Sequence, residues 1–467
     1  MSDMFKQARE LHHSGELQAA EALYRQHLEQ EPDDFKAHCN LGCLLEEQGR
    51  LVEAQKCQMT ACRIKPDEYM PHYNLGHVLQ RQNRLEAAAD AYRRALELAP
   101  GYMAAHFNLG KLLHDQGQVE DAVTSLQRAA ECDPESFEAH VELGAVLFGL
   151  KRVDEAVVAY QRALEVNPEA DEQHYFLGRM LETLGRFPEA EAAFRRTLEL
   201  RPVSVVTMEA LASLVHKMGK QDEAIEVLEA WLQMMPDEPR AVHLLAALSG
   251  DAVPERAADS YVATVFDQFS ADFDETLERL DYRAPQLVQQ ALAREYPQMD
   301  GSLRILDAGC GTGLCGPLLT PYAKRLVGVD LSEGMLEKAR NRGGYDELVC
   351  EELTRYLERS PADFDVIVSA DTLNYFGDLA AVFAAARQAL RAGGRFIFTL
   401  EHTQADGDEP GYILNPHGRY SHTESYVSET LVAAGFSISG MVGGVLRTEE
   451  GQPVMGLVIT AIRVPDE

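Results

Sequence analysis

The sequence has 467 residues, of which 46% are hydrophobic and 25% are charged, as in a globular protein of two or three domains. Its net charge of −32 is spread over both halves of the chain, so neither half offers the positive surface that attracts nucleic acids or anionic membranes. The first residues lack a signal-peptide pattern, and no apolar run is long enough to cross a bilayer. We therefore expect a cytoplasmic protein that binds neither nucleic acid nor membrane.

The eight cysteines include no Cys-x-x-Cys pair, which also favours a reducing compartment. Four of them, Cys39, Cys43, Cys57 and Cys62, crowd into one stretch with spacings that suit packing inside helices. A zinc site is the alternative for this group. We predict buried thiols and no metal.

Prolines recur every 34 residues through the first half of the chain, and so do alanines and Leu-Gly pairs. The prolines are Pro32, Pro66, Pro100, Pro134, Pro168, Pro202 and Pro236. This period is typical of tetratricopeptide repeats, in which small residues let two helices approach and a proline ends the second. We predict seven repeats over 1–238, then a capping helix and linker over 239–260.

Three asparagines occupy the sixth position of consecutive repeats: Asn40, Asn74 and Asn108. This stretch resembles the superhelix of protein O-linked N-acetylglucosamine transferases, where an asparagine ladder holds an extended peptide. An amide suits that role because it donates and accepts hydrogen bonds at once. The ladder ends at Glu142, and the alternative is that Asn-Leu-Gly is simply common in such repeats. A histidine also recurs two residues before this position, and we expect it to pack rather than bind metal.

The stretch 261–300 follows the linker, and its first part, 261–282, has an amphipathic pattern. Phe266, Phe269 and Phe273 are three and four residues apart, which indicates one face of a helix. Packing between two domains is one interpretation of this face, and a cover over a bound ligand is the other.

Residues 301–467 alternate apolar strands with helices, which predicts a mostly parallel sheet covered on both faces. The first strand runs into ILDAGCGTGLCG, residues 305–316, where a ligand is expected at the carboxyl ends of the strands. This stretch fits two patterns. Asp-x-Gly-x-Gly-x-Gly from Asp307 to Gly313 is a methyl-donor loop, whereas Gly311, Gly313 and Gly316 also spell a dinucleotide loop.

From 301 onward the chain resembles class I S-adenosylmethionine-dependent methyltransferases. The motifs that carry the resemblance are LDAGCGTG at 306–313, GVDLSEGML at 328–336, FDVIVSADTLNY at 364–375 and LRAGGRFIF at 390–398. The two last apolar runs also read as an antiparallel hairpin, with which sheets of this class end. The resemblance therefore favours the methyl-donor loop. It implies a Rossmann-like α/β domain with a seven-stranded sheet after the all-α solenoid, and a lid formed by 261–282.

The resemblance implies a role for several residues at the donor, S-adenosylmethionine. Asp307 helps to hold its ammonium group, and Asp330 accepts the ribose hydroxyls. Glu352 stands where the family has an aspartate that contacts the adenine, with Glu351 as its rival. The other implied donor contacts are Gly309, Gly311, Gly313, Leu331, Met335 and Leu353.

The acceptor side is expected just past the fourth strand and in NPHGRYSH, residues 415–422, which resembles a segment of bacterial methyltransferases fused to such repeats. Methyl transfer needs alignment and, for some acceptors, a base. The predicted catalytic residues are Asp371, Tyr420 and His422, and His402 and His417 are further candidates for a base. The predicted substrate contacts on this side are Asn374, Tyr375 and Arg419.

The sequence thus predicts a methyltransferase whose repeats hold a protein or peptide substrate. Two alternatives remain open. One is a small-molecule methyltransferase whose repeats dock partner proteins, and the other is a scaffold that senses S-adenosylmethionine without turnover.

Overall fold

The computed structural model describes residues 3–270, 272–404, 411–449 and 451–465. The chain divides into two compact units, Met1–Thr207 and Met208–Glu467. The division falls close to the start of a helix, α13, that spans Val205–Lys217 in the last predicted repeat.

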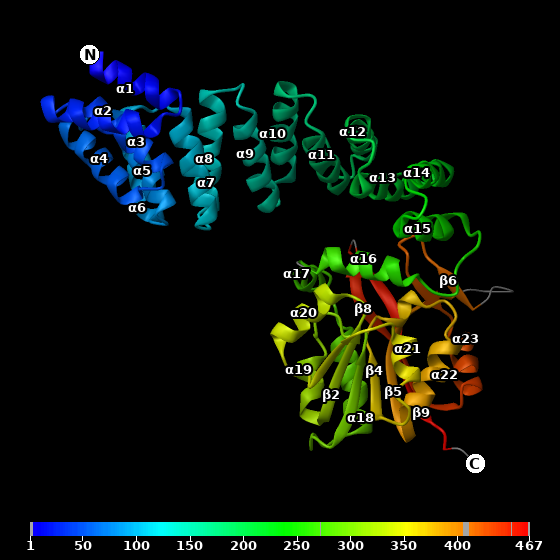
Figure 1. The fold of residues 1–467 in the computed structure, drawn as a ribbon. Coiled ribbons are helices and arrows are strands. Elements are labelled where there is room, and N and C mark those ends of the chain that lie inside the picture. The colour runs from blue at the N-terminus through cyan, green and yellow to red at the C-terminus, as the bar shows by residue number, and fades with distance from the viewer. Residues whose placement is uncertain (1–2, 271, 405–410, 450, 466–467) are drawn as a thin grey trace. The chain divides into compact units, whose positions relative to one another are not determined.

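The first unit consists of helical hairpins, as the 34-residue period predicts (Figure 1). Its helices are α1 Asp3–His13, α2 Leu17–Gln30, α3 Phe35–Glu47, α4 Leu51–Ile64, α5 Tyr69–Arg81, α6 Leu85–Leu98, α7 Met103–Asp115, α8 Val119–Cys132, α9 Phe137–Gly149, α10 Val153–Val166, α11 Asp171–Thr183 and α12 Phe187–Leu200. The glycine of each Leu-Gly pair lets the paired helices touch. A Cβ atom at Gly76, for example, would lie 2.7 Å from the ring of Tyr92 on the next helix.

The recurring histidines have the packing role that the sequence predicts. In each of five repeats the ring Nε2 donates a hydrogen bond to the carbonyl of the proline six residues earlier, at 2.9–3.3 Å. These histidines are His38, His72, His106, His140 and His174. Each bond fixes the turn that enters a repeat, because it occupies a carbonyl that the preceding helix leaves free.

The second unit begins with helices and continues into a sheet. After α13 come α14 Gln221–Met234, α15 Pro239–Ser249, α16 Asp259–Phe269, α17 Phe273–Arg279 and α18 Ala284–Glu295. The later helices are α19 Gly316–Leu319, η1 Thr320–Tyr322, α20 Glu333–Arg342, α21 Leu353–Glu358, η2 Leu373–Tyr375, α22 Ala380–Ala389 and α23 Glu424–Ala433. The strands are β1 Leu303–Ala308, β2 Ala323–Asp330, β3 Glu347–Cys350, β4 Phe364–Ser369, β5 Leu390–His402, β6 Tyr412–Leu414, β7 Tyr420–His422, β8 Phe436–Glu449 and β9 Gln452–Arg463.

The strands form one sheet, in the order β3-β2-β1-β4-β5 with parallel pairing. The strand β9 then pairs antiparallel with β5, and β8 pairs antiparallel with β9, which gives the predicted terminal hairpin. The short strands β6 and β7 extend the sheet beside the end of β5. This confirms the predicted α/β class. Among the described residues the sheet has nine strands instead of the predicted seven, because it also contains the short strands β6 and β7.

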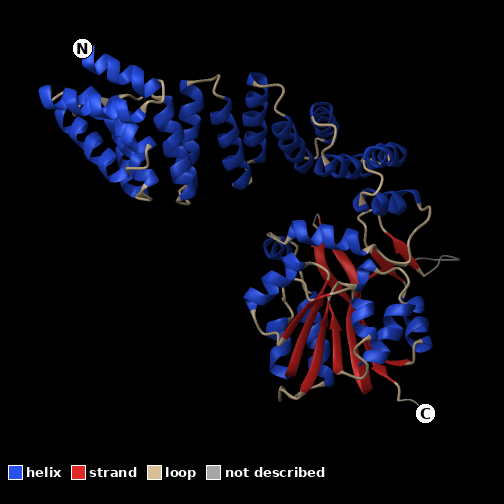
Figure 2. Ribbon diagram, viewed as in Figure 1, coloured by secondary structure: helices blue, strands red, loops and turns tan. Residues whose placement is uncertain are grey.

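Helices cover both faces of the sheet (Figure 2). Alternate residues of β1 point to opposite faces, so Leu306 packs in the core that α21, α22 and α23 cover, and Ile305 packs in the core under α18 and α19. Both side chains are fully buried. Because β1, β2 and β4 are parallel, their carboxyl ends meet at one edge, where the candidate site lies.

Candidate active site

A cavity of about 320 Å³ lies at the carboxyl ends of β1, β2 and β4. Its size falls at the lower end of the range for small-molecule sites. The loop after β1, the end of β2, the start of α21 and the loop after β4 form its floor, and α16 and α17 form its cover. In the loop after β1, glycine residues expose the backbone to the cavity.

The glycine loop follows β1 with left-handed backbone at three positions, φ 77° at Gly309, 54° at Gly311 and 83° at Gly313. Only glycine adopts such angles without strain. The turn is fixed by the Gly309 and Cys310 amides, which both donate to the carbonyl of Val329 at the end of β2. A Cβ atom at Gly311 would meet nothing within 4 Å, so the backbone at Gly311 can be approached closely from the cavity.

Asp330, the last residue of β2, lines the cavity. Its carboxylate accepts hydrogen bonds from the amides of Gly311 (2.8 Å) and Ser332 (2.9 Å), one on each oxygen. Burial raises the pKa of this carboxyl, and the backbone donors oppose that rise. Each oxygen retains acceptor capacity, so Asp330 can receive two further hydroxyl hydrogen bonds side by side.

Asp307, the predicted partner of the ammonium group, lies beneath the loop rather than on the cavity wall. The Tyr345 hydroxyl donates to its Oδ2 at 2.6 Å, and its buried Oδ1 has no hydrogen-bond partner among the described residues. Burial raises the pKa of Asp307 to about 7, although the bond from Tyr345 lowers it.

This pKa makes stability depend on pH. The folded value of about 7 lies above the value of about 4 for an unfolded aspartate. The folded protein thus binds more protons between these values, and the contribution of Asp307 to stability falls as the pH rises from about 4 to about 7. We expect Asp307→Asn to remove that fall, so that its unfolding free energy gains a few kcal/mol relative to wild type across this window. The measurement is urea denaturation of both proteins at pH 5 and pH 8. If the unfolding free energy changed by the same amount between these pH values in both proteins, the raised pKa of Asp307 would be contradicted.

Of the other predicted donor contacts, Leu331, Glu352 and Leu353 line the cavity. Both oxygens of Glu352 cap α21, accepting from the amides of Thr354 and Arg355 at 2.9 Å. Its rival Glu351 also lines the cavity, where Arg359 pairs with its Oε2. Two predicted donor contacts, Gly313 and Met335, are not among the described residues that line the cavity.

The cover of the cavity is the predicted amphipathic segment, and its phenylalanines Phe266, Phe269 and Phe273 line the cavity. Two aspartates tie this cover to the loops beneath it. Asp267 accepts a hydrogen bond from the hydroxyl of Ser332. Asp274 accepts from the hydroxyl of Thr312 and pairs with Arg342. This segment therefore lines the cavity and is joined by hydrogen bonds to the loops after β1 and β2.

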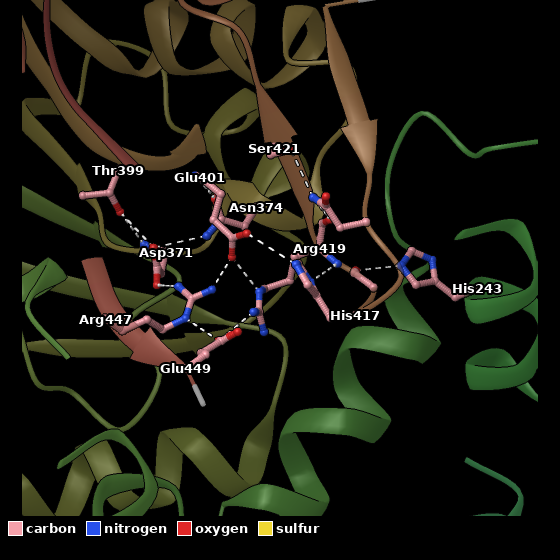
Figure 3. Close-up of polar contacts among 12 residues, drawn as sticks. His243, Asp371, Asn374, Thr399, Glu401, His417, Arg419, Ser421, Arg447 and Glu449 are labelled. Carbon is pink, nitrogen blue, oxygen red and sulfur yellow. Dashed lines mark hydrogen bonds and ion pairs between the residues drawn. The ribbon is translucent and has the colours of Figure 1, made fainter. Parts of the chain in front are cut away.

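The opposite end of the cavity holds an acid–arginine cluster, which we define as Asp371, Glu401, Arg419, Arg447 and Glu449 (Figure 3). The buried Arg447 guanidinium donates to all three carboxylates, to Asp371 Oδ2 and Glu449 Oε1 at 2.6 and 2.7 Å and to Glu401. Arg419 bridges Glu401 (2.6 Å) and Glu449 (2.7 Å).

The pKa values of this cluster are set by two opposing effects, burial and the two arginine charges. Burial alone would raise the pKa of Glu401, but Arg419 and Arg447 outweigh it and hold that pKa below its usual value. The pKa of Asp371 is raised by burial, and Arg447 opposes the rise. Asp371 also has left-handed backbone, with φ 61°, which is uncommon outside glycine and concentrates at functional sites.

The structure divides the predicted acceptor-side residues into two groups. Asp371, Tyr375 and Arg419 line the cavity, and the Tyr375 ring lies edge-on to Phe266 with centroids 5.4 Å apart. Asn374 is fully buried and holds the cluster in place, donating to Asp371 Oδ1 (3.1 Å) and accepting from the Glu401 amide (2.9 Å).

Tyr420 and His422 form the second group and are not among the described residues that line the cavity. NPHGRYSH reads as a polar loop, but its last three residues form β7, and both side chains are fully buried there. The Tyr420 hydroxyl donates to the Pro254 carbonyl at 2.7 Å, and His422 Nε2 donates to the Gly377 carbonyl at 3.0 Å. Burial lowers the pKa of His422 to about 4, so the ring is neutral at pH 7. This geometry gives both side chains a structural role instead of a place at the cavity.

Residues 306–398 match the family described as a methyltransferase domain. Residues 73–137, 115–164 and 141–205 match one tetratricopeptide repeat family, and residues 23–56 match another. The chain carries tetratricopeptide repeats and a methyltransferase domain. No helix among the described residues has the length and apolar character needed to cross a membrane.

The methyltransferase domain is similar to curated proteins. Human methyltransferase-like protein 27 is 36% identical over 111 residues, which are 23% of this chain and 45% of that protein. A ubiquinone biosynthesis O-methyltransferase of Idiomarina loihiensis is 31% identical over 100 residues, 21% of this chain and 41% of that protein. The chain thus spans less than half of the length of these two relatives. Among solved structures, YrrB, described as a tetratricopeptide protein with an unusual peptide-binding site, matches with TM-score 0.36 and 21% identity over 40% of this chain and 96% of that chain.

Sequence reasoning missed several residues of the methyltransferase domain that the structure brings to the site. Arg447 and Glu449 lie in the terminal hairpin, and Thr312 lies between the loop glycines. The signal for Arg447 was a single cation inside the apolar run that forms β8, where an unpaired charge would be costly. A cation in such a place requires buried carboxylates from elsewhere in the fold.

Proposed function

We propose that the protein is an S-adenosylmethionine-dependent methyltransferase that acts in the cavity. The observation that carries this proposal is Asp330, whose carboxylate lines the cavity with acceptor capacity left, beside backbone at Gly311 that a ligand can approach closely. A carboxylate that can receive two neighbouring hydroxyls fits a ribose, and the apolar side chains of Leu331 and Leu353 fit an adenine ring. The residues present therefore fit S-adenosylmethionine, which when bound supplies an electrophilic methyl group.

The chain's own residues would align the acceptor with that methyl group and accept the proton that the acceptor loses. The segment 261–282 lines the cavity with its phenylalanines, and we assign to it the role of a lid that limits the access of water. At the acceptor end, Asp371 is the predicted base that lines the cavity, whereas His402, Tyr420 and His422 do not appear among the described lining residues. We assign to Asp371 the role of accepting a hydrogen bond or a proton from the acceptor, with Arg447 fixing its orientation.

We further propose that the repeats recruit a protein or peptide substrate. Asn40, Asn74 and Asn108 lie on the first helices of consecutive repeats, α3, α5 and α7, and each is partly exposed. Asn108 also borders a hollow of about 400 Å³, together with Arg81 and Lys111. Amides in such a row can hydrogen-bond the backbone of an extended chain.

The asparagines provide a test that spares the cavity. We expect simultaneous replacement of Asn40, Asn74 and Asn108 by alanine to lower methyl transfer to protein at least tenfold. The peptide backbone would then lose its hydrogen bonds to the three side-chain amides. The assay uses methyl-labelled S-adenosylmethionine with an extract of the source organism as the supply of acceptors. Binding of S-adenosylhomocysteine, measured by calorimetry, should stay within twofold of wild type. Unchanged labelling of protein would exclude the peptide role.

A second candidate is transfer to a small molecule, with the repeats docking partner proteins. The observation that favours it is the cover, since its phenylalanines line the cavity and Phe266 packs edge-on against Tyr375 beside the charged acceptor end. Aromatic side chains next to charged groups suit a compact acceptor with apolar and polar parts. The same assay separates the candidates, because label would then appear in small molecules and survive the triple substitution.

The eight cysteines are all free in the structure. Free thiols persist where the compartment is reducing, which supports the cytoplasmic location that we propose from the sequence.

A further inference from the structure

The helix after the last repeat, α15, contacts the turn between β6 and β7 through a histidine. His243 is buried, and its Nε2 lies 2.9 Å from the carbonyl oxygen of Gly418 in the turn between β6 and β7. A carbonyl only accepts, so this nitrogen carries the proton and donates. The imidazole also stacks on the ring of Tyr261 in α16, with centroids 4.1 Å apart.

The turn is shaped for this close approach. Gly418 has φ 82°, which a side chain would strain, and a Cβ atom there would collide with the hydroxyl of Tyr261. The position thus requires glycine on two grounds, its backbone angle and its neighbour. In this turn the Gly418 carbonyl accepts its hydrogen bond from the ring of His243.

The linker after α15 forms hydrogen bonds with β7 and with the loop after β4. The Pro254 carbonyl accepts from the Tyr420 hydroxyl at 2.7 Å. The Glu255 carbonyl accepts from the amides of Gly377 and Asp378 at 2.8 Å. The Ala257 amide donates to the carbonyl of Tyr375 at 2.8 Å. The linker therefore lies along the loop after β4, which carries the acceptor-side residues.

Arg419 stands between the two anchored residues, Gly418 and Tyr420. Its guanidinium lines the cavity and bridges Glu401 and Glu449 (Figure 3). Holding the backbone on both sides of Arg419 fixes the point from which its long side chain starts, so the guanidinium can reach both carboxylates without an additional loss of backbone entropy. The anchors come from α15 and the linker, outside the residues that carry the methyltransferase motifs.

We propose that His243 is a positioning residue for Arg419, so that the helix after the last repeat forms part of the acceptor site. The linker and the Tyr261 ring complete this connection. The methyltransferase domain alone, without α15, would then bind the donor but present a misplaced Arg419 to the acceptor. This inference rests on the proposed function for its activity readout.

The test uses the full-length chain and three substitutions at one position. A glutamine amide nitrogen can occupy the place of Nε2, whereas an asparagine amide nitrogen matches Nδ1, which faces away from Gly418. We expect His243→Ala and His243→Asn to lower methyl transfer from labelled S-adenosylmethionine to extract acceptors about tenfold. His243→Gln should recover most of the rate. His174→Ala removes a similar ring-to-carbonyl bond in the repeats and serves as the matched control.

Two further readouts separate positioning from loss of fold. Calorimetric binding of S-adenosylhomocysteine should stay within about twofold in all variants, since the glycine loop and Asp330 do not contact His243. Amide hydrogen exchange, followed by mass spectrometry, should rise in residues 411–423 for the alanine and asparagine variants and stay unchanged in 305–316.

The outcomes are distinct. Equal rates for the asparagine and glutamine variants, or a wild-type rate for the alanine variant, would overturn the positioning role. A wild-type protein that binds no S-adenosylhomocysteine would instead overturn the proposed function, before the variants are compared.

Discussion

Replacing Arg447 by methionine is expected to destabilise the second unit by roughly 3–5 kcal/mol, the range for a buried ion pair that loses one partner. The Arg447 side chain is 5% exposed and is the common partner of Asp371, Glu401 and Glu449. Methionine fills similar space but leaves three carboxylates with Arg419 as their remaining cluster cation. The shift should appear as a fall of about 10 °C or more in the thermal transition of this unit, measured by calorimetry.

The loss should also depend on pH in a definite direction. In the wild type the pKa values of Glu401 and Glu449 are held below their usual value. Each therefore contributes stability that is present above the unfolded pKa of about 4.3 and is lost as the pH falls through the folded value. The difference between wild type and Arg447→Met should thus be larger at pH 7.5 than at pH 4. Arg283→Met, which removes an exposed partner of Asp281, should change stability by less than about 1 kcal/mol. A pH-independent difference would contradict the role given to the cluster.

Asp330→Ala is expected to weaken binding of S-adenosylhomocysteine at least 100-fold. Two hydrogen bonds between a carboxylate and hydroxyls contribute about 1.5–3 kcal/mol each, and roughly 3 kcal/mol corresponds to a factor of 100 or more. The substitution also removes the acceptor for the amides of Gly311 and Ser332, which loosens the glycine loop.

The matched control is Asp346→Asn. This residue directly precedes β3, and its carboxylate accepts from the Leu326 amide of β2 but does not line the cavity. Calorimetry should show wild-type affinity for the control. Near-wild-type affinity for Asp330→Ala would remove Asp330 from the donor site and leave the motif without its assigned role.

Local patterns made most of the fold predictable. The repeats follow from a period within one stretch of sequence, and each hairpin is decided by small residues and prolines close to one another. The glycine loop and Asp330 were predictable for the same reason, because the tight turn from β1 into α19 and the acidic end of β2 are each encoded by a short contiguous motif.

The acid–arginine cluster could not be predicted as a unit, because its residues come from the loop after β4, from β5, from the turn before β7 and from β8, and are joined by the folding of the sheet. Tyr420 and His422 show the converse difficulty. The polar residues of this segment suggest an exposed loop. Both side chains are nevertheless buried, because each donates a hydrogen bond to a backbone carbonyl. The sequence contains no local signal for such a distant carbonyl partner.

The most direct test of the central claim is transfer of label from methyl-labelled S-adenosylmethionine by the full-length chain in an extract of the source organism, with Asp330→Ala as the parallel sample. Label should be counted separately in protein and in small molecules. We expect label in protein with the wild-type chain and at most a few per cent of that label with Asp330→Ala. Binding of S-adenosylmethionine without labelled product in either fraction would contradict a methyltransferase and leave a donor-sensing scaffold.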